Sequence, residues 1–515
     1  MNRLSIQWKC LAVGALLALQ NIVAAPVVLK PANFAHYSER FNAMEDENIT
    51  NTIPNAAAWT WMQEQIPFFE CPDSEIEELY YFRWWSYRKH LVQTTNGWVI
   101  TEFLTPVRHA GVDNTISCAI GFHLAEGRWL HDPAYLNDDT RFWLRGNAGQ
   151  VQPHLHKFSG WIAAAVYDRY TVTGDRSWVM GLLPDLVADF RTWEKERQAT
   201  NGLFWQYDVR DGMEESISGS RTNQNQRPTI NSYQFANARA IAQMARLAGD
   251  RPLADEFTAQ ADHLKQLVEA RLWNPVDRFF EVLRPDGHFV GVREELGFIP
   301  WMFHLPDNQP SYAAAWNQLM DSKGFAAPYG LMTAEWRHPQ FRSHGVGKCE
   351  WDGAVWPFAT SQTLYALANV LRDYTQTNVA SRDYFEVFRT YAYSQHAADK
   401  PYIGEYLDET TGAWINGKNG RSRYYNHSTF ADLLITGVVG LCPRADATVE
   451  IVPLLPPGTW NYFCLDDVPY HGHRLTVFWD QDGTRYKRGA GLVVLADGKE
   501  IAHGPKLEKL TAQLP

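Results

Sequence analysis

The sequence predicts an all-α (α/α)6 barrel, a toroid of six helical hairpins, followed by a small C-terminal antiparallel β module. Three observations predict this fold class. Helical periodicity of apolar residues dominates from about residue 34 to residue 441. Within that stretch the helices come in pairs, of which the first is apolar all round and the second is amphipathic. Past residue 441 the pattern changes to short runs with two-residue alternation, which is typical of strands.

The predicted helix pairs are separated by short turns, two of which contain Gly-Asp. A helix that is apolar on all sides is buried, and a helix with one charged face lies at the surface. Alternation of the two kinds therefore predicts an inner ring of helices wrapped by an outer ring. A solenoid of helix pairs is the alternative, but it should have a fixed sequence repeat, and we find none. The pairs are 158–171 with 178–196, 233–247 with 253–272, and 357–374 with 382–395, and further helices are expected at 75–90, 115–124 and 428–440.

The last part of the chain has the pattern of strands and turns. Residues 448–454 and 474–479 alternate between apolar and polar side chains, and the turn sequence Pro456-Pro457-Gly458 lies between them. No cluster of catalytic residue types occurs there. We therefore expect residues 442–515 to form a packing or capping domain beside a catalytic barrel of residues 26–441.

The N-terminus resembles a secretory signal peptide. Arg3 and Lys9 precede the apolar run 10–19, and small residues at 23–25 offer a cleavage site. The run is too short to span a bilayer, and no later stretch is long and apolar enough to do so. We therefore expect residues 1–25 to be removed and the mature protein to be secreted, with no membrane partner.

Composition excludes several classes of partner. The net charge is -11 and no basic stripe appears, so we predict no nucleic-acid partner. No CxxC or other metal-ligand spacing occurs, so we predict neither a metal nor a cofactor. The chain contains 21 Trp, 23 Tyr and 26 Phe. Most of these rings should fill the core, but so many also suit a site that stacks on flat, weakly polar faces such as sugar rings. The oligomeric state stays open.

The loop at residues 207–221 places carboxylates beside aromatic rings. It lies between two long helical segments and contains Asp211, Glu214 and Glu215 soon after an aromatic run that ends at Tyr207. An apolar wall disfavours the charged form of a carboxyl group and so raises its pKa. A raised carboxyl pKa is what a general acid needs at mild pH. The plainer alternative is a solvated acidic loop, but the aromatic neighbours and a second carboxylate downstream favour a functional one.

The predicted architecture decides where such a loop lies. Inner helices run one way and outer helices return, so the loops that precede inner helices all gather at one mouth of the toroid. Loops that a rigid scaffold gathers often carry function, so one deep pocket at that mouth is the expected site. The long loops of this kind are 145–157, 202–230, 330–355 and 402–425.

A second carboxylate, Glu405, precedes the last inner helix, with Tyr402 and Tyr406 beside it. Two carboxylates on facing loops of one pocket suit glycosidic hydrolysis, in which one protonates the leaving oxygen and the other activates water from the opposite face of the sugar ring. A carboxyl of the 207–221 loop and Glu405 are therefore the candidates for the general acid and the general base.

Aromatic and polar neighbours of these loops are candidate sugar-binding residues. Each signal is weak by itself, because a Trp is more often a core residue, His427 is more often structural, and Arg83 could simply pair with a carboxylate. Their joint placement at one mouth favours function. The candidates are Arg83, Trp84, Asp211, Arg221, Trp351, Asp352, Trp356, Tyr406, Asn426 and His427.

At these residues the chain resembles the trehalase-like and processing-glucosidase-like inverting hydrolases, glycoside hydrolase families 37 and 63, and it is similar to the smaller branch with the glucosylglycerate and mannosylglycerate hydrolases. The resemblance covers about residues 80–441. Residues 212–216 match the Gly-aromatic-Asp-x-Ser acid loop, 405–412 the Glu-Tyr-x-x-x-Thr-Gly base segment, and 353–357 the Gly-Pro-x-Trp-Pro segment. Here Glu replaces Asp at the acid, and Ser220-Arg221 stands where Ser-Pro-Arg is usual.

The resemblance implies inverting hydrolysis of an α-linked gluco- or manno-configured glycoside, so a carbohydrate is the expected partner. It also places the acid at Glu214, so the adjacent Glu215 should turn away and pair with a basic group or meet solvent. Two other classes stay open. A polysaccharide lyase on an α/α toroid would use Tyr425 and His427 and release an unsaturated uronic acid. A non-catalytic sugar-binding protein would bind ligand with an affinity unaffected by Glu405→Gln.

Overall fold

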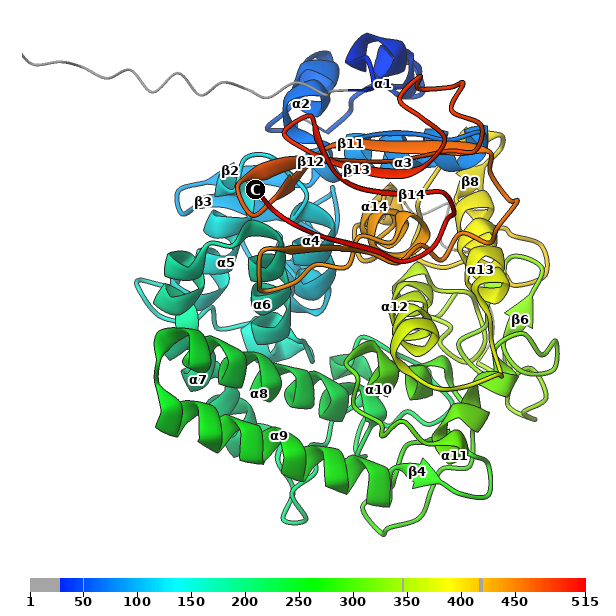
Figure 1. The fold of residues 1–515 in the computed structure, drawn as a ribbon. Helices are drawn as coiled ribbons and strands as arrows, with labels where there is room; N and C mark the ends of the chain where they lie inside the picture. Colours follow the sequence, from blue (N-terminus) through cyan, green and yellow to red (C-terminus); the bar gives the residue numbers. More distant parts are fainter. Residues whose placement is uncertain (1–27, 50, 345–346, 416–419) are drawn as a thin grey trace, which may run out of the picture.

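The computed structural model describes residues 28–49, 51–344, 347–415 and 420–515, and the predicted signal peptide lies outside this range. The chain is mainly helical, with a small antiparallel sheet that its C-terminal part largely forms (Figure 1). Within the described ranges, no helix has the length and apolar character that a membrane span requires. The five cysteines of the described part are all free thiols.

The predicted helices are present, whereas α1, α2 and α5 were not predicted. The predicted pairs correspond to α6 with α7, α8 with α9 and α12 with α13, and α14 continues as a π-helix over Leu434–Val439. The helices are α1 (Ala35–Asn42), α2 (Ala58–Gln65), α3 (Ser74–Lys89), α4 (Ile120–Gly127), α5 (Ala134–Arg145), α6 (Ile162–Thr173), α7 (Arg176–Arg197), α8 (Pro228–Ala248), α9 (Arg251–Arg271), α10 (Ile299–Met302), α11 (Pro310–Ala313), α12 (Pro357–Asp373), α13 (Ser381–Ser394) and α14 (Ala431–Leu433).

The Gly-Asp turns of the first two pairs work in the same way. Gly174 ends α6 with φ 67° and Gly249 ends α8 with φ 78°, a left-handed conformation that glycine adopts without a steric penalty. The aspartate that follows each glycine caps the next helix. Asp175 accepts from the backbone N–H of Trp178 at 3.0 Å, and Asp250 caps α9 in the same way. Each dipeptide therefore ends one helix and starts the next.

The first helices of the pairs pack on one another in a closed circuit. α4 packs on α6, α6 on α8, α8 on α10, α10 on α12, α12 on α14, and α14 on α4. The second helices bury one face only, as α9 does with Ala254, Phe257, Ala261, Leu264 and Val268. The predicted distinction between buried and surface helices is therefore confirmed. The segment between α9 and α12 was not predicted, because α10 and α11 have only four residues each and give too little periodicity.

The sheet has five strands in the order β1-β11-β12-β13-β14, and all neighbouring strands are antiparallel. A separate pair joins β10 to β15. The strands are β1 (Phe68–Glu70), β10 (Thr448–Ile451), β11 (Tyr462–Tyr470), β12 (His473–Asp480), β13 (Gly491–Ala496), β14 (Lys499–Gly504) and β15 (Leu510–Gln513). Two-stranded hairpins lie in the helical part: β2 (Leu91–Thr94) with β3 (Gly97–Ile100), β4 (Trp273–Asn274) with β5 (Phe279–Phe280), β6 (Ala326–Ala327) with β7 (Gly330–Leu331), and β8 (His396–Ala397) with β9 (Lys400–Pro401).

One edge strand of the five-stranded sheet comes from the N-terminal part of the chain. In β1, Phe68 pairs with Asp466 and Glu70 pairs with Cys464 of β11. The carboxylate of Asp466 also accepts from the backbone N–H of Leu29 at 2.8 Å. The predicted C-terminal sheet is therefore present, but it takes one strand and one anchor from residues far upstream. Three residues are too few for an alternation that the sequence would reveal.

Candidate functional site

Glu214 lies in the loop between α7 and α8 and is half-buried. The loop turns at Gly212, which has φ 71°, and the backbone N–H of Met213 donates to the carbonyl of Asp208 at 3.0 Å. Burial raises the pKa of Glu214 to about 7, with the carboxylate of Glu405 adding to the rise and the cation of Arg221 opposing it. Glu214 and Glu405 therefore belong to one electrostatic site, although they lie on loops far apart in the sequence.

The adjacent residue, Glu215, points elsewhere. Its backbone has φ 65°, a left-handed conformation that separates the directions of the two neighbouring side chains. Its Oε1 lies 2.9 Å from the guanidinium of Arg221, which also contacts Asp208 Oδ1 at 3.1 Å. The prediction that Glu215 pairs with a basic group is therefore confirmed. Arg221 is 46% exposed, so it lies at the rim of the site.

Glu405 lies in the loop after β9, with a side chain that is almost wholly buried. The hydroxyl of Ser422 donates to its Oε2 at 2.9 Å, and Nη2 of Arg421 lies 3.5 Å from the same oxygen. Two backbone hydrogen bonds, each 3.0 Å long, join Val355 to Leu407. These bonds tie the loop of Glu405 to the loop before α12, as the predicted gathering of loops at one mouth requires.

Three predicted aromatic residues form a stack behind this loop. The rings of Trp351 and Trp356 have centroids 4.3 Å apart, and those of Trp356 and Tyr406 are 4.5 Å apart, with interplanar angles of 21° and 12°. All three are buried, and the hydroxyl of Tyr406 accepts from the backbone N–H of Cys349 at 3.1 Å. The stack is therefore a rigid wall of the site that shows little surface. Asp352 is also buried and accepts from the backbone N–H of His344 at 2.9 Å.

Asn426 and His427 lie under the site. The side-chain amide of Asn426 donates to the carbonyl of Thr101 at 3.2 Å, so it is used to hold the backbone. The ring of His427 packs edge-on against Tyr425, with centroids 4.0 Å apart. Burial, helped by the charge of Arg83, holds the pKa of His427 well below its usual range. The imidazole is therefore neutral, which agrees with a structural histidine more than with a proton shuttle.

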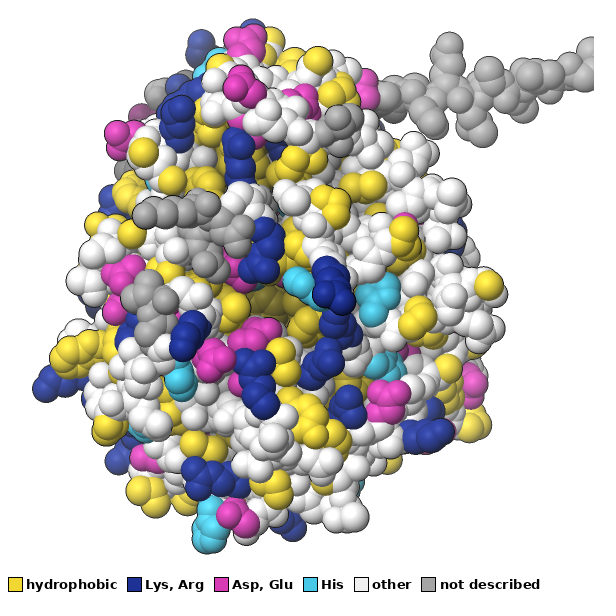
Figure 2. Space-filling view, turned by 180° about the vertical axis from the view of Figure 1, so that it is seen from behind, with side chains coloured by type: hydrophobic (Ala, Val, Ile, Leu, Met, Phe, Trp, Pro, Cys, Tyr) yellow, Lys and Arg dark blue, Asp and Glu magenta, His cyan; other side chains and the backbone are white. Residues whose placement is uncertain are grey.

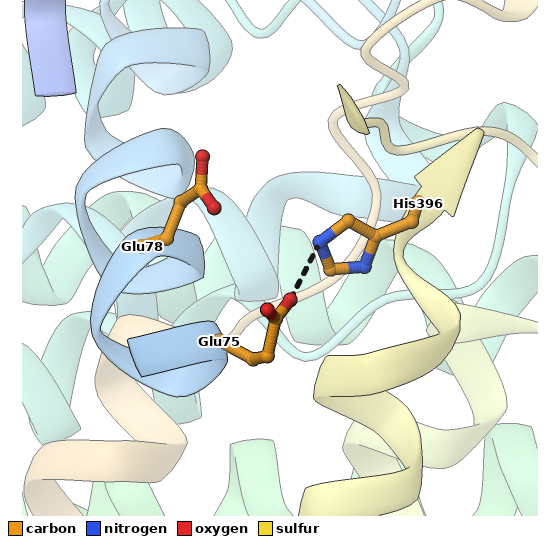
Figure 3. A group of neighbouring side chains, drawn as sticks. All are labelled: Glu75, Glu78 and His396. Atoms are coloured by element: carbon orange, nitrogen blue, oxygen red, sulfur yellow. Dashed lines mark ion pairs between the residues drawn. The ribbon is translucent and has the colours of Figure 1, made fainter. Parts of the chain in front are cut away.

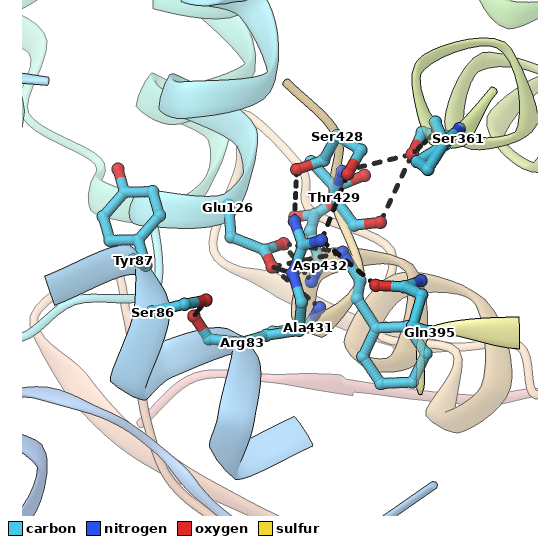
Figure 4. A network of polar contacts seen from close by, with 12 residues as sticks. Arg83, Ser86, Tyr87, Glu126, Ser361, Gln395, Ser428, Thr429, Ala431 and Asp432 are labelled. Carbon is cyan, nitrogen blue, oxygen red and sulfur yellow. Dashed lines mark hydrogen bonds and ion pairs between the residues drawn. The ribbon is translucent and has the colours of Figure 1, made fainter. Parts of the chain in front are cut away.

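Arg83 serves protein groups in a buried network (Figure 4). Its guanidinium donates to Ser428 Oγ at 3.1 Å and lies 3.6 Å from Glu126 Oε1. The carboxylate of Glu126 accepts from the backbone N–H groups of Phe430, Ala431 and Asp432, which open α14. Arg83 therefore positions the start of the last inner helix, and the structure does not support the prediction that it binds substrate.

Two further predictions are corrected by burial. Trp84 has no exposed surface and packs edge-on against Tyr80 and Tyr87 in the core. Asp211 is fully buried and accepts from Arg227 Nε at 2.7 Å and from the hydroxyl of Thr229. Trp84 therefore offers no stacking face, and the carboxylate of Asp211 serves the first turn of α8. Both residues lie next to motifs of the predicted site in the sequence. Adjacency in the sequence does not determine the direction in which a side chain points.

The structure adds a third carboxyl that sequence reasoning missed. Glu102, in the segment after β3, accepts from the hydroxyl of Tyr425 and from the thiol of Cys118, the latter at 3.3 Å. Burial raises the pKa of Glu102 to about 7, and the carboxylates of Glu405 and Glu214 add to the rise. The available signal was one acid inside the apolar stretch of residues 98–104, but no glycine or motif marked it.

Basic side chains gather around His109, and one of them, Arg421, also contacts Glu405. Lys157 donates to the carbonyl of His109, and the positive charges of Lys157 and Arg421 lower the pKa of His109, after burial as the main cause. Arg210 acts in the same way on Lys157. The face turned away from the viewer of Figure 1 has a hollow near its centre, with hydrophobic side chains at its floor and charged and histidine side chains around it (Figure 2).

Two other features lie apart from the predicted site residues. A cavity of about 810 Å³ lies inside the ring of helices, lined by α4, α6, α8 and α12 and by residues 441–446 of the C-terminal part. Glu75, Glu78 and His396 offer ligand atoms within 4.8 Å of one another (Figure 3). Arg40 already pairs with Glu78 at 3.0 Å, and His396 lies 3.3 Å from Glu75. Each of the two carboxylates in this group therefore already has a basic partner, Arg40 for Glu78 and His396 for Glu75.

Comparisons with known proteins assign the chain to a family. Residues 112–428 match the family model of the mannosylglycerate hydrolase MGH1-like glycoside hydrolase domain, and residues 444–503 match the C-terminal domain of glycosyl hydrolase family 65. A solved structure described as a sialidase is 52% identical with a TM-score of 0.94, covering 95% of this chain and 45% of its own. The chain therefore spans less than half the length of that protein.

Two more distant structures share the fold. The family 78 rhamnosidase of Bacillus sp. GL1 is 14% identical with a TM-score of 0.58, covering 84% of this chain and 41% of its own. The α-L-rhamnosidase of Streptomyces avermitilis, solved with L-rhamnose, is 14% identical with a TM-score of 0.51, covering 84% of this chain and 38% of its own.

The matched glycoside hydrolase domain confirms the predicted enzyme class, a glycosidase. More narrowly, the chain belongs to the mannosylglycerate hydrolase MGH1-like glycoside hydrolase family, whose model covers more than half of it.

Proposed function

We propose that this protein is an inverting glycoside hydrolase in which Glu214 is the general acid and Glu405 is the general base. The observation that carries the proposal is the pKa of Glu214, which burial and the Glu405 carboxylate raise to about 7. A carboxyl group with that pKa keeps its proton at mild pH and can deliver it to a leaving oxygen. Glu405 instead contacts the Ser422 hydroxyl and the Arg421 cation, which suits a carboxylate that accepts a proton.

The reaction uses the two carboxyls once each. Glu214 gives its proton to the glycosidic oxygen as the bond to the anomeric carbon breaks. Glu405 takes a proton from a water molecule that attacks the same carbon from the opposite face, so the configuration inverts. Glu405 then returns its proton to solvent and Glu214 regains one, which restores the starting state.

An α-linked gluco- or manno-configured glycoside is the substrate class that the family resemblance supports, and we place it in the hollow of Figure 2. An acidic glycoside is a second candidate. The basic groups Lys157, Arg210 and Arg421 lie close enough together to affect neighbouring pKa values, and their charges suit a carboxylated sugar. The 52% identical structure is described as a sialidase, but that protein is more than twice as long as the stretch it shares with this chain.

The rest of the architecture follows the same proposal. The closed packing circuit of α4, α6, α8, α10, α12 and α14 supports an (α/α)6 barrel as the catalytic domain of residues 26–441, with residues 442–515 as its β-rich companion. We also propose export, with residues 1–25 as a cleaved signal peptide. N-terminal sequencing of the protein recovered outside the cell should then begin at residue 26.

A substrate screen read by proton NMR tests this function. The purified protein is incubated with α-glucosides, α-mannosides, glucosylglycerate, mannosylglycerate and a sialoside, and proton NMR identifies the first anomer released. Inversion predicts a β-anomer from an α-glycoside within the first turnovers. An α-anomer would mean retention, and a product that absorbs in the ultraviolet as an unsaturated uronic acid would favour the lyase. Ligand binding without any released sugar would leave a sugar-binding protein.

A further inference from the structure

Glu102 sits between the loop of Glu405 and the start of α4. Its Oε1 accepts from the hydroxyl of Tyr425, and its Oε2 accepts from the thiol of Cys118 at 3.3 Å. Its carbonyl accepts from the backbone N–H of Asn426 at 2.9 Å. The side chain and the backbone carbonyl of Glu102 therefore both bind the segment at residues 425–426, which follows the Glu405 loop.

Tyr425 connects Glu102 to the loop that contains Glu405, the proposed general base. Its backbone N–H donates to the carbonyl of Ile403 at 3.2 Å, two residues before Glu405. Its ring packs edge-on against Phe103 and His427, with centroids 4.5 and 4.0 Å away. Tyr425 therefore connects Glu102, through its hydroxyl, to the Glu405 loop, through its backbone N–H.

The largest influences on the pKa of Glu102 are burial, two hydrogen bonds and two neighbouring carboxylates. The groups that face it are the Tyr425 hydroxyl and the Cys118 thiol, whose hydrogen bonds favour its charged form, and the carboxylates of Glu405 and Glu214, which oppose it. Glu214 in turn faces Glu405, Arg221 and Asp208. A buried carboxyl whose two hydrogen bonds come from a hydroxyl and a thiol is sensitive to nearby charge, so its protonation state depends on its two acidic neighbours.

We propose that Glu102 is a third carboxyl of the reaction centre, a positioning residue that holds Tyr425 against the Glu405 loop and whose charge governs when Glu214 releases its proton. This inference rests on the proposed roles of Glu214 and Glu405. Glu102 does not touch the substrate, because both of its oxygens are taken and its side chain is almost wholly buried. It acts on the reaction in two ways: its hydrogen bond positions Tyr425, and its negative charge raises the pKa of Glu214.

The sign of this effect follows from like-charge repulsion. While Glu102 is ionised it opposes the ionisation of Glu214, so the acid keeps its proton to a higher pH. Glu102→Gln removes that charge and keeps a similar shape. The alkaline limb of the pH–rate profile should then move to lower pH by about one unit on substrates with poor leaving groups. Tyr425→Phe should move the limb in the same direction, because Glu102 loses a hydrogen bond that favours its charged form.

The experiment measures kcat/KM against pH, together with Tm, for wild type, Glu102→Gln, Tyr425→Phe and Glu295→Gln. Glu295 is a matched control, since it is a buried carboxyl that accepts from the hydroxyl of Thr363 at 2.9 Å and neither Glu214 nor Glu405 acts on it. Glu295→Gln should lower Tm without moving the alkaline limb. A limb that stays in place in both Glu102→Gln and Tyr425→Phe, with only Tm lowered, would overturn the proposal.

Infrared titration gives a readout that needs no turnover. Several buried carboxyls, including Asp139 and Asp467, should lose their protons near pH 7 in wild type, so the signals are read as differences between variants. Glu102→Gln should remove one of these titrations and lower the midpoint of the one that Glu214→Gln removes. If wild type releases no sugar, the proposed function fails, yet this titration still decides whether Glu102 and Glu214 are coupled. If the Glu102→Gln variant does not fold, Tyr425→Phe answers by the same measurement. Unchanged titration of the remaining group in the folded variant would refute the coupling.

Discussion

The guanidinium of Arg221 lies 2.9 Å from Oε1 of Glu215, while Glu214, one residue earlier, is half-buried near Glu405. The left-handed backbone at Glu215, with φ 65°, is what separates the two side chains. One glutamate of the pair is therefore neutralised at the rim, and the other is kept in an apolar setting that favours its proton. The two variants of this pair make a matched test of the acid.

Glu214→Gln should lose activity according to the leaving group. A glycosyl fluoride or a nitrophenyl glycoside needs little protonation, so the variant should keep much of its rate on it, whereas natural glycosides should slow by about 10²–10⁴-fold. Glu215→Gln should cost far less on both kinds of substrate. Steady-state kinetics on the two substrate types checks this. The assignment is wrong if Glu215→Gln has the leaving-group-dependent loss and Glu214→Gln does not.

Glu405→Gln should abolish turnover on every substrate, because the change is nearly isosteric and removes the group that takes the proton from water. The expected loss is about 10²–10⁴-fold in kcat, regardless of leaving group. Ser422→Ala removes one hydrogen bond to the same carboxylate and should cost much less. Circular dichroism should find both variants folded. Activity of Glu405→Gln within tenfold of wild type would remove Glu405 from the role.

Stability should depend on pH through Glu214. Its folded-state pKa of about 7 lies above the ordinary value of 4.5, so folding favours the protonated form. This contribution is fully present below about pH 4.5 and is lost as pH rises through 7. Glu214→Gln, which cannot ionise, should have the Tm of wild type at pH 4 and a higher Tm at pH 8. Glu215→Gln is the control for surface charge, and an equal rise of Tm in both variants would contradict the assignment to burial.

Arg83 should matter for stability and hardly for substrate binding. Arg83→Ala leaves the buried carboxylate of Glu126 without its cation 3.6 Å away, which should cost about 3–5 kcal/mol in the free energy of unfolding. The double variant Arg83→Met with Glu126→Gln removes both charges and should recover much of the loss. Urea unfolding measures the stability, and KM should stay near that of wild type in the double variant. A large rise in KM with intact stability would restore the substrate-binding role.

The sequence reveals those features that depend on local pattern. Gly174-Asp175 and Gly249-Asp250 end and start helices by their own chemistry, so the pairs they join could be predicted closely. The pair Glu214 and Glu405 could be named because each follows a recognisable motif. Trp84 and Asp211 were misjudged because adjacency to a motif does not fix the direction of a side chain.

The role of Glu102 and the strand β1 could not be predicted, because both depend on contacts with residues far away in the sequence. Glu102 is one acid in an apolar stretch until Tyr425, more than 300 residues later, donates to it. The short helices α10 and α11 could not be predicted for a different reason. Each has four residues, which make barely one helical turn and show no periodicity.

The strand β1 is placed only when β11 exists, and almost 400 residues separate the two along the chain. The first described residues also lack their partner until then, because the backbone N–H of Leu29 donates to the carboxylate of Asp466. During synthesis β1 therefore stays unpaired until the last tenth of the polypeptide is available, which exposes apolar Phe68 and Phe69 in the meantime. A chain cut after residue 441 would leave this edge unpaired, so we expect such a truncated helical domain to aggregate, although every predicted catalytic residue lies within it.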